Sequence, residues 1–184
     1  MGIKLFGKNI VQMYSHDIMR LDYKAVSKEI QTVSHFSIRK IDMNKIEYEL
    51  EPIGSTISIT HLKRLVSKNK SLCEGFIFER MGKAIGTIWV MYNGANDLEY
   101  KIRNIDAYIF DVYVKESSRG NGYACEMVRC LMSYLYGKGI ETAHLAVATT
   151  NRSAIHAYEK TGFVTVSKRN FIRLLKVNIP YCIL

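Results

Sequence analysis

One stretch constrains the fold of this chain more than any other, because it joins a strongly β-prone run to a glycine-rich turn and an amphipathic helix. Residues Ala107–Val114 read Ala-Tyr-Ile-Phe-Asp-Val-Tyr-Val. Over Gly122–Tyr136, apolar residues recur at i, i+3, i+4 and i+7, and Gly137 follows as a helix stop. A helix with a single apolar face has to cover another apolar surface. We therefore expect this helix to pack on a sheet that contains the 107–114 strand.

The rest of the chain carries the same two kinds of pattern. The predicted elements are strand Phe36–Asp42, helices Met43–Leu50 and Ile59–Lys68, strands Leu72–Arg80 and Lys83–Tyr92 around the turn Met81-Gly82, strand Ala107–Val114, helix Gly122–Tyr136, strand Thr142–Ala148, helix Asn151–Thr161, and a final hairpin of Phe163–Ser167 and Phe171–Val177 around Lys168-Arg169-Asn170. The order βααβββαβαββ contains no internal repeat. It predicts a mixed α/β domain of the α+β class.

Residues 1–34 are interpreted as an N-terminal extension. Ile10–Leu21 is rich in apolar residues and predicts one additional strand or a short hairpin, whereas Asp22–Ser34 has the polarity of a linker. The predicted organisation is this extension followed by one domain over residues 35–184. The composition, 184 residues of which 48% are hydrophobic and 23% charged, is typical of a globular chain and excludes global disorder.

Charge and composition narrow the classes of function. The 26 Lys and Arg exceed the 17 Asp and Glu, and a net charge of +9 favours an anionic ligand. Because the basic residues are scattered and no nucleic-acid-binding signature occurs, a phosphorylated cofactor explains the sign as well, and no nucleic acid partner is predicted. No apolar run is long enough to span a membrane, and the four Cys form no close pair, which fits a reducing cytoplasm. The five His show no metal-binding spacing, so no metal is expected.

The turn before the 122–136 helix reads Ser118-Arg119-Gly120-Asn121-Gly122-Tyr123-Ala124. Its glycines let the backbone approach a ligand and expose successive N–H groups, while the helix N-terminus and Arg119 add positive charge. It is neither a Walker loop, because no Gly-Lys-Ser/Thr follows, nor a dinucleotide fingerprint, because the glycine spacing differs. The turn therefore predicts a phosphate cradle, with a plain turn that needs glycine for positive φ as the structural alternative.

A second motif, Asn-x-x-Ala-x-x-x-Tyr-x-x-x-Gly-Phe, occupies Asn151–Phe163. Together with Arg119–Ala124 it resembles the two acetyl-CoA-binding motifs of the GNAT superfamily of N-acetyltransferases. The resemblance covers roughly Phe36–Val177 and agrees with the predicted order of elements. It implies a GNAT-like fold, with a central, twisted, mostly antiparallel sheet of about six or seven strands and about four helices on its two faces.

The resemblance also implies which residues hold acetyl-CoA. The amides of Arg119, Gly120, Asn121, Gly122, Tyr123 and Ala124 would hold the pyrophosphate, and the strand backbone at Val112, Tyr113 and Val114 would face the pantetheine arm. That arm carries two amides and can pair with an open strand edge, which the family leaves free because its next strand, here 142–148, splays away. Asn151 would cap the following helix and reach the cofactor through its amide, with a purely structural cap as the alternative.

Tyr158 and Asp111 are the predicted catalytic residues. The resemblance implies that the Tyr158 hydroxyl lies beside the thioester sulfur, and an amphipathic core tyrosine is the alternative. A phenol with a pKa of about 10 donates its proton to a thiolate with a pKa of about 8.5 at a cost of about 2 kcal/mol, so a stabilising hydrogen bond is predicted instead. Asp111 is predicted to be the base, directly or through a water, with Asp106 in reserve; a structural ion pair is the alternative for both.

Strand alternation is the basis for assigning the faces of the 107–114 strand. It predicts Asp111 and Tyr113 on one face, and Tyr108, Phe110, Val112 and Val114 on the other.

The predicted function is acetyl-CoA-dependent transfer of an acetyl group to a primary amine of a small molecule, by direct attack in a ternary complex. The net positive charge favours an anionic acceptor, such as an amino sugar derivative. Acetylation of a protein or peptide amine is the alternative within the class, and a non-catalytic acyl-CoA sensor is the alternative outside it. The predicted partners are acetyl-CoA and the amine, with no membrane, and a homodimer is compatible with the sequence.

Overall fold

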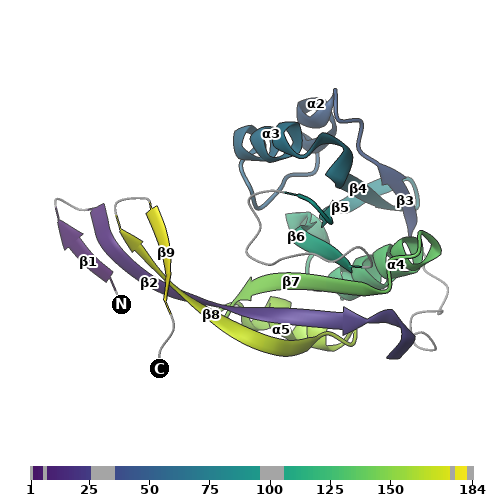
Figure 1. Ribbon diagram of the computed structural model, residues 1–184. Coiled ribbons are helices and arrows are strands. Elements are labelled where there is room, and N and C mark those ends of the chain that lie inside the picture. The colour runs from purple at the N-terminus through teal and green to yellow at the C-terminus, as the bar shows by residue number, and fades with distance from the viewer. Residues whose placement is uncertain (1, 6–7, 26–35, 96–105, 175–176, 182–184) are drawn as a thin grey trace.

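The computed structural model describes residues 2–5, 8–25, 36–95, 106–174 and 177–181. The labelled strands and helices are β1 (Gly2–Leu5), β2 (Lys8–Asp22), β3 (Ser37–Lys40), α2 (Ile46–Leu50), α3 (Ile59–Lys68), β4 (Cys73–Arg80), β5 (Lys83–Tyr92), β6 (Asp106–Val114), α4 (Tyr123–Gly137), β7 (Thr142–Ala148), α5 (Arg152–Glu159), β8 (Val164–Leu174) and β9 (Val177–Tyr181) (Figure 1). From β3 onward this order confirms the predicted succession of strands and helices, apart from two short 3₁₀ helices at Lys70–Leu72 and Glu116–Ser118.

All the strands described belong to one nine-stranded sheet with the order β3-β4-β5-β6-β7-β2-β8-β9, and β1 pairs with β2. Among these pairs, β6 with β7 is parallel and the others are antiparallel. The mixed α/β class and the mostly antiparallel sheet are therefore confirmed. The helix α4 supplies the crossover that a parallel pair requires.

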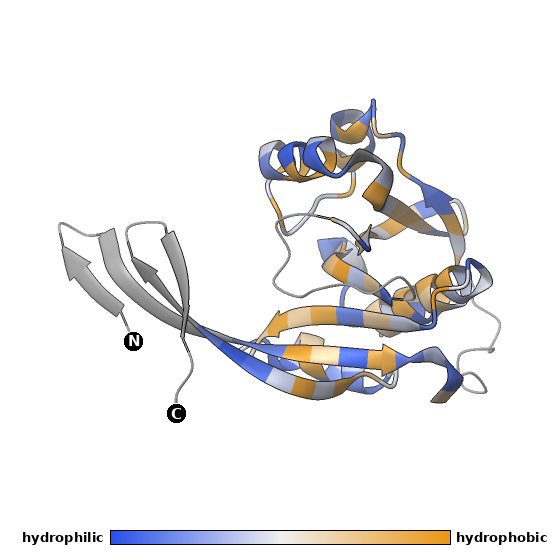
Figure 2. Cartoon of the chain, in the orientation of Figure 1, coloured by the Kyte–Doolittle hydropathy of each residue, from blue (hydrophilic) through white to orange (hydrophobic). Residues whose placement is uncertain are grey.

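Helices cover both faces of the sheet, and each face has its own apolar core (Figure 2). The helices α4 and α5 pack on one face through Met127, Val128, Leu131, Leu135 and Ile155. The helices α2 and α3 pack on the other through Ile46, Leu50, Leu62, Leu65 and Val66. A fully buried side chain of this size stabilises the fold by about 1.5–3 kcal/mol, so these helices are fixed to the sheet mainly by burial of one apolar stripe each.

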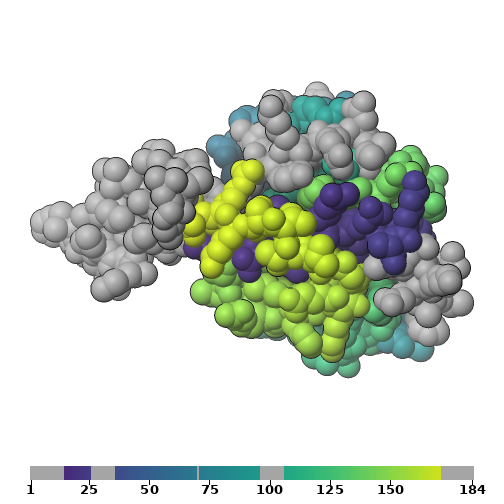
Figure 3. Space-filling view, turned by 60° about the horizontal axis from the view of Figure 1, so that its bottom comes forward, coloured from purple at the N-terminus to yellow at the C-terminus, as the bar shows by residue number. Residues whose placement is uncertain are grey.

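The strand β2 lies inside the sheet, between β7 and β8, although its residues fall in the segment interpreted as an extension. His16–Asp22 pairs with β7, and Val11–Arg20 pairs with β8. Figure 3 shows β2 and β8 side by side on the surface of the molecule. Ile18, Met19 and Leu21 are fully buried in β2. The strand β2 covers the residues for which one additional strand or a short hairpin is predicted, and it lies between two strands from much later in the chain.

The predicted turn at Lys168-Arg169-Asn170 is wrong, because β8 runs without interruption through these residues and β9 begins at Val177. The polar run has partners across the sheet in β2: Lys168 lies opposite Asp17, and Asn170 lies opposite Ser15. The Ser15 hydroxyl donates to Asn170 Oδ1 at 2.6 Å. A polar segment was interpreted as a turn, but complementary cross-strand pairs stabilise it as a strand.

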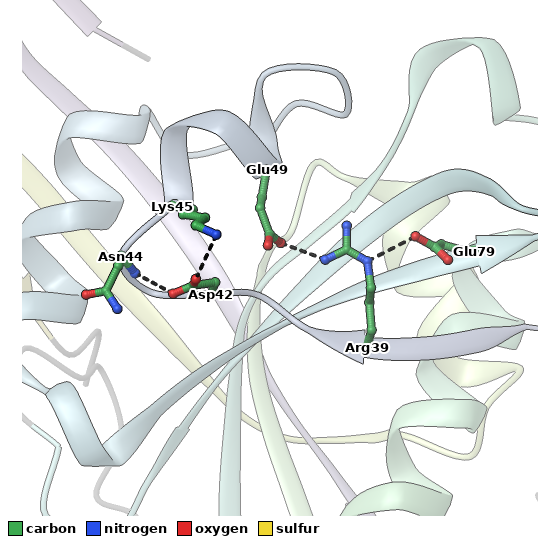
Figure 4. Close-up of polar contacts among 6 residues, drawn as sticks. All are labelled: Arg39, Asp42, Asn44, Lys45, Glu49 and Glu79. Atoms are coloured by element: carbon green, nitrogen blue, oxygen red, sulfur yellow. Dashed lines mark hydrogen bonds and ion pairs between the residues drawn. The ribbon is translucent and has the colours of Figure 1, made fainter.

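The start of α2 is later than predicted, at Ile46, because Asp42 organises a turn before it: its carboxylate accepts from the amide of Asn44 at 2.9 Å. Arg39 of β3 then ties the helix to the sheet (Figure 4). Its guanidinium donates to Glu49 of α2 at 2.8 Å and to Glu79 of β4 at 3.0 Å. This bridge holds α2, and so the loop that leaves it, against the sheet.

Candidate active site

The strand β6 has an open edge at its C-terminal half. It pairs with β7 only over Asp106–Ile109, opposite Thr142–Leu145, and no described residue of β7 pairs with residues 110–114. On its other side, Trp89 pairs with Asp111 and Val90 pairs with Ile109, so one residue of β6 has no partner there. This is a β-bulge, which bends a strand, and the pairing with β5 continues beyond it to Val114. Because β7 pairs with β6 only as far as Ile109, the backbone edge at residues 112–114 is open on the β7 side. This is the open edge that the family resemblance predicts.

Because of this bulge, the residues on each face of β6 differ from those predicted. Tyr108 and Phe110 belong to the core under α2 and α3, and Tyr113 packs there too. Val112 and Val114 belong to the opposite core, under α4 and α5. The prediction that all four of Tyr108, Phe110, Val112 and Val114 share one face is wrong, because the extra residue shifts the alternation by one position.

The glycine turn between β6 and α4 has the backbone that its sequence predicts. Gly120 and Gly122 have φ of 80° and 74°, a left-handed conformation that other residues rarely adopt. A β-carbon at either position would meet nothing within 4 Å, so a ligand has room to approach this backbone. The Asn121 amide donates back to the carbonyls of Ser118 and Arg119 and closes the turn. The first amides of α4 then point out of the helix end, where an anion is favoured.

Arg119 lies against the end of β6. Its Nε donates to the carbonyl of Val114 at 3.1 Å, and its guanidinium sits over the Tyr113 ring, 5.6 Å from the centroid. Arg119 also approaches Glu116 at 3.7 Å, on the protein surface. The guanidinium therefore lies between the glycine turn and the open strand edge.

A single cavity of about 440 Å³ joins these parts. The residues that line it are Thr56, Val112, Tyr113, Val114, Ser118, Arg119, Gly120, Gly122, Tyr123, Ala124, Asn151, Ser153, Ala154, Ala157 and Tyr158. All the predicted site residues line it except Asp111 and Asn121. The open edge of β6, the glycine turn and the face of α5 thus meet around one space.

At the start of α5, Asn151 acts as a helix cap. Its side-chain oxygen accepts from the amide of Ala154 at 3.2 Å and from the hydroxyl of Ser153 at 3.1 Å. Asn151 therefore has the structural role of a helix cap, and it also lines the cavity.

Tyr158 projects from α5 into the cavity, and its ring packs against Phe163 with centroids 5.9 Å apart. Burial, and to a smaller extent the nearby charge of Asp111, raises the pKa of the Tyr158 phenol to about 12. At neutral pH the hydroxyl therefore keeps its proton and can donate it in a hydrogen bond.

Asp111 is buried, with 3% of its surface exposed, and two hydroxyls bind its carboxylate. The Ser55 hydroxyl donates to Oδ2 at 2.8 Å, and the Thr56 hydroxyl donates to Oδ1. Burial raises the pKa of Asp111, whereas the two hydroxyl donors act against that rise. Asp106, the reserve candidate, is fully buried at the other end of β6, with Oδ2 at 3.4 Å from His144 Nε2, and does not line the cavity.

The sequence of the site and its geometry agree with the comparison to known families. A sequence model described as "Acetyltransferase (GNAT) family" matches residues 42–163, which is more than half of the chain. The chain belongs to the GNAT acetyltransferase family.

Relatives of this GNAT chain include a mycothiol acetyltransferase from Streptomyces coelicolor, 28% identical over 90 residues, which are 49% of this chain and 26% of that protein. The chain thus spans about a quarter of the length of the curated relative that it matches. An acetyltransferase from Clostridium acetobutylicum, crystallised with acetyl-CoA, has a TM-score of 0.51 at 24% identity, covering 72% of this chain and 92% of that one. An aminoglycoside acetyltransferase from an uncultured soil metagenomic sample, crystallised with sisomicin, has a TM-score of 0.50 at 17% identity, covering 69% and 87%. These structures share the fold.

Residues 51–57 of this GNAT chain, between α2 and α3, carry no functional motif in the sequence, and we name them the acceptor loop. Its Pro, Gly, Ser and Thr are typical of a loop, but no local signal connects Ser55 or Thr56 with Asp111 more than 50 residues later. Arg80 belongs to no motif either: its guanidinium donates to the Tyr123 hydroxyl at 2.8 Å and lies over that ring, next to the glycine turn.

Two findings bear on other partners of this GNAT domain. Within the described residues, no group of three or more His, Cys, Asp or Glu side chains is placed to hold a metal ion. In the same part of the chain, no helix has both the length and the apolar content needed to cross a membrane.

Proposed function

We propose that the protein is an acetyl-CoA-dependent N-acetyltransferase that acetylates a primary amine of a small molecule. The observation that carries this proposal is the single cavity where the open edge of β6, the glycine turn and Tyr158 meet. Family membership supports the reaction class. The mycothiol and aminoglycoside acetyltransferases among its relatives support an acceptor of small size.

The residues around the cavity fit acetyl-CoA, which would supply an acetyl group activated as a thioester. The backbone amides from Arg119 to Ala124 would bind the pyrophosphate, because they stand at a helix N-terminus with room in front of Gly120 and Gly122. The backbone of Val112 and Val114 would pair with the amides of the pantetheine arm along the open edge. On binding, Arg119 would release the Val114 carbonyl, to which its Nε now donates.

The proposed role of Tyr158 is hydrogen-bond donation to the sulfur that leaves. With a pKa of about 12, against about 8.5 for a thiol, complete transfer of the phenol proton would be uphill by about 5 kcal/mol. A donor that keeps its proton still stabilises developing negative charge in a site with little water. The hydroxyl of Tyr158 therefore stabilises the negative charge on the sulfur by a hydrogen bond and keeps its own proton.

The proposed role of Asp111 is to accept the proton that the amine loses. It lies on β6 next to Val112 and is bound by Thr56, both of which line the cavity, and it holds no ion pair with a basic side chain among the described residues. Because burial raises its pKa, Asp111 is a stronger base than an exposed aspartate. The negative carboxylate also favours a cationic ammonium group in the acceptor at this point.

For the rest of the acceptor, we keep the proposal of an anionic small molecule such as an amino sugar derivative, supported by the net charge of +9. An acceptor can carry both an ammonium group and an anionic group. The ammonium group would face Asp111, and the anionic group would face the basic protein surface. The reaction would take place in the cytoplasm.

The test combines calorimetry with a survey of amines. Acetyl-CoA is titrated into the protein in 0.15 M salt, with duplex DNA as the comparison, and the release of free thiol is then measured with amino sugars, polyamines, aminoglycosides and peptides. We expect heat with acetyl-CoA, none with DNA, and thiol release with a small amine. Absence of heat with every CoA species would refute the proposal. Binding without thiol release would instead indicate a sensor, and release with peptides alone would indicate a protein acetyltransferase.

A further inference from the structure

The acceptor loop places two neighbouring hydroxyls on the two oxygens of one buried carboxylate. The Ser55 hydroxyl donates to Asp111 Oδ2 at 2.8 Å, and the Thr56 hydroxyl donates to Oδ1. Both oxygens are therefore bound by donors from a single dipeptide, which fixes the plane of the carboxylate as well as its position. Of the two hydroxyl residues, only Thr56 lines the cavity, and its hydroxyl connects the cavity wall with the Asp111 carboxylate.

The loop itself is held rigidly, so its hydroxyls stay in place. The amide of Gly54 donates to the carbonyl of Leu50 at 2.7 Å and prolongs the end of α2. The amide of Ile57 donates to the Ser55 hydroxyl oxygen at 3.2 Å, which leaves the hydroxyl hydrogen for Asp111. Ile53 is buried and anchors the loop in the core under α2 and α3.

We propose that Ser55 and Thr56 are positioning residues that fix the Asp111 carboxylate and hold it ionised, so that it can take the proton of the acceptor amine. This inference rests on the proposed function, in which Asp111 is the base. Because Asp111 does not line the cavity, the proton passes through one water. An N–H bond of the amine breaks as an O–H bond forms on that water, and another O–H bond of the water breaks as one forms on Asp111. Both hydroxyl hydrogens stay on Ser55 and Thr56. The carboxyl group then passes its proton to water after the product leaves.

The environment of Asp111 explains why such donors are needed. Burial disfavours the charged form of a carboxyl group, and hydrogen bonds donated to its oxygens favour it. Within the described residues, no basic side chain is paired with Asp111, and the titratable group that interacts with it is Tyr158 of α5, which is neutral at neutral pH. Trp89, the residue opposite Asp111 on β5, carries no charge. The two hydroxyls, together with the backbone amide of Thr56, are thus the groups that offset the cost of burying the charge.

The test measures the ionisation of Asp111 directly, in the full-length protein and without an acceptor. The carboxyl carbon of Asp111 is followed by ¹³C NMR in protein labelled with [¹³C]aspartate, with Asp111→Asn to assign the signal. We expect Ser55→Ala and Thr56→Val each to move the titration of Asp111 to higher pH by about one unit, because each removes one donor to the carboxylate. Thr56→Ser, which keeps the hydroxyl, should restore most of the shift.

Controls separate this inference from loss of fold and from the proposed function. Ser67→Ala removes a hydroxyl of α3 that donates to the Arg64 carbonyl and does not contact Asp111. This variant should leave the titration of Asp111 unchanged. Thermal unfolding checks that each variant is folded. If Thr56→Val does not fold, the titration of Asp111 in Ser55→Ala alone tests the inference. An unmoved titration in the folded variants would overturn the inference while leaving the base role of Asp111 intact. Full acetyl transfer by Asp111→Asn would overturn the base role, and with it the catalytic purpose of the two hydroxyls.

Discussion

The ring of Tyr113 lies directly against the backbone of Gly54, so closely that a β-carbon at residue 54 would stand 2.8 Å from the ring. Gly54 also has a φ of 100°, which other residues rarely adopt. The guanidinium of Arg119 lies over the same ring. Tyr113 therefore connects the acceptor loop with the glycine turn, and the two halves of the cavity share one aromatic side chain.

Replacing Gly54 by Ala should displace the acceptor loop. The new methyl group collides with Tyr113 and the left-handed φ is strained, so we expect a loss of stability of about 2 kcal/mol and a larger loss in turnover than in acetyl-CoA affinity. Thermal unfolding measures the stability, release of free thiol measures the turnover, and calorimetry measures the affinity for acetyl-CoA. Gly82→Ala is the matched control, because Gly82 also has positive φ, at 71°, but a β-carbon there meets nothing within 4 Å. Equal behaviour of the two variants would show that the Tyr113 contact has no consequence.

Replacing Tyr158 by Phe should lower kcat by about 100-fold, because the variant loses the hydrogen bond to the leaving sulfur. Affinity for acetyl-CoA should change little, since the ring that lines the cavity remains. The measurement is the rate of thiol release with the amine found in the survey. Tyr48→Phe on α2 is the control, because that side chain is 77% exposed. Unchanged turnover in Tyr158→Phe would remove this hydroxyl from the mechanism.

Replacing Gly122 by Ala should weaken acetyl-CoA binding by about tenfold, or about 1.4 kcal/mol, because a methyl group would enter the cavity in front of the helix amides. Calorimetry gives the affinity. Gly139→Ala carries the same backbone strain, with φ of 82°, but lies beyond the other end of α4. If both variants bind acetyl-CoA with the affinity of the unmodified protein, the phosphate is held elsewhere.

Replacing Asp111 by Asn should alter stability in a pH-dependent way. Burial raises the pKa of Asp111 on folding, so its protonated form stabilises the fold, and that contribution is lost as the pH rises through the folded-state pKa. Asn carries no charge at any pH. The difference in Tm, variant minus unmodified protein, should therefore be more positive at pH 8 than at pH 4.

The control for this experiment is Glu51→Gln, at an exposed carboxylate on the surface. Its difference in Tm should vary less with pH. A difference for Asp111→Asn that grows toward acid pH would contradict the direction of the shift.

Local signals predicted most of the site. Glycine spacing and helix periodicity predicted the turn and α4, and β5 and β7 have the bounds that their β-prone runs indicated. These features depend on neighbours in the sequence. The roles of the individual site residues and the boundary after residue 34 remain predictions.

Other features could not be predicted, because they depend on contacts between distant residues. The bulge in β6 shifts Tyr108 and Phe110 by one register position, which periodicity alone does not reveal. The strand through Lys168 is stabilised by β2, about 150 residues earlier. The link from Ser55 to Asp111 joins a loop to a strand and has no sequence pattern at all.

The place of β2 in the sheet has a consequence for synthesis. Among the described strands, β2 joins β7 to β8, so this half of the sheet cannot form until the chain has been synthesised as far as residue 174. Until then, the edge of β2 that pairs with β8 has no partner strand from β8 on the nascent chain. We therefore expect β2 to need protection from aggregation until β8 has been synthesised.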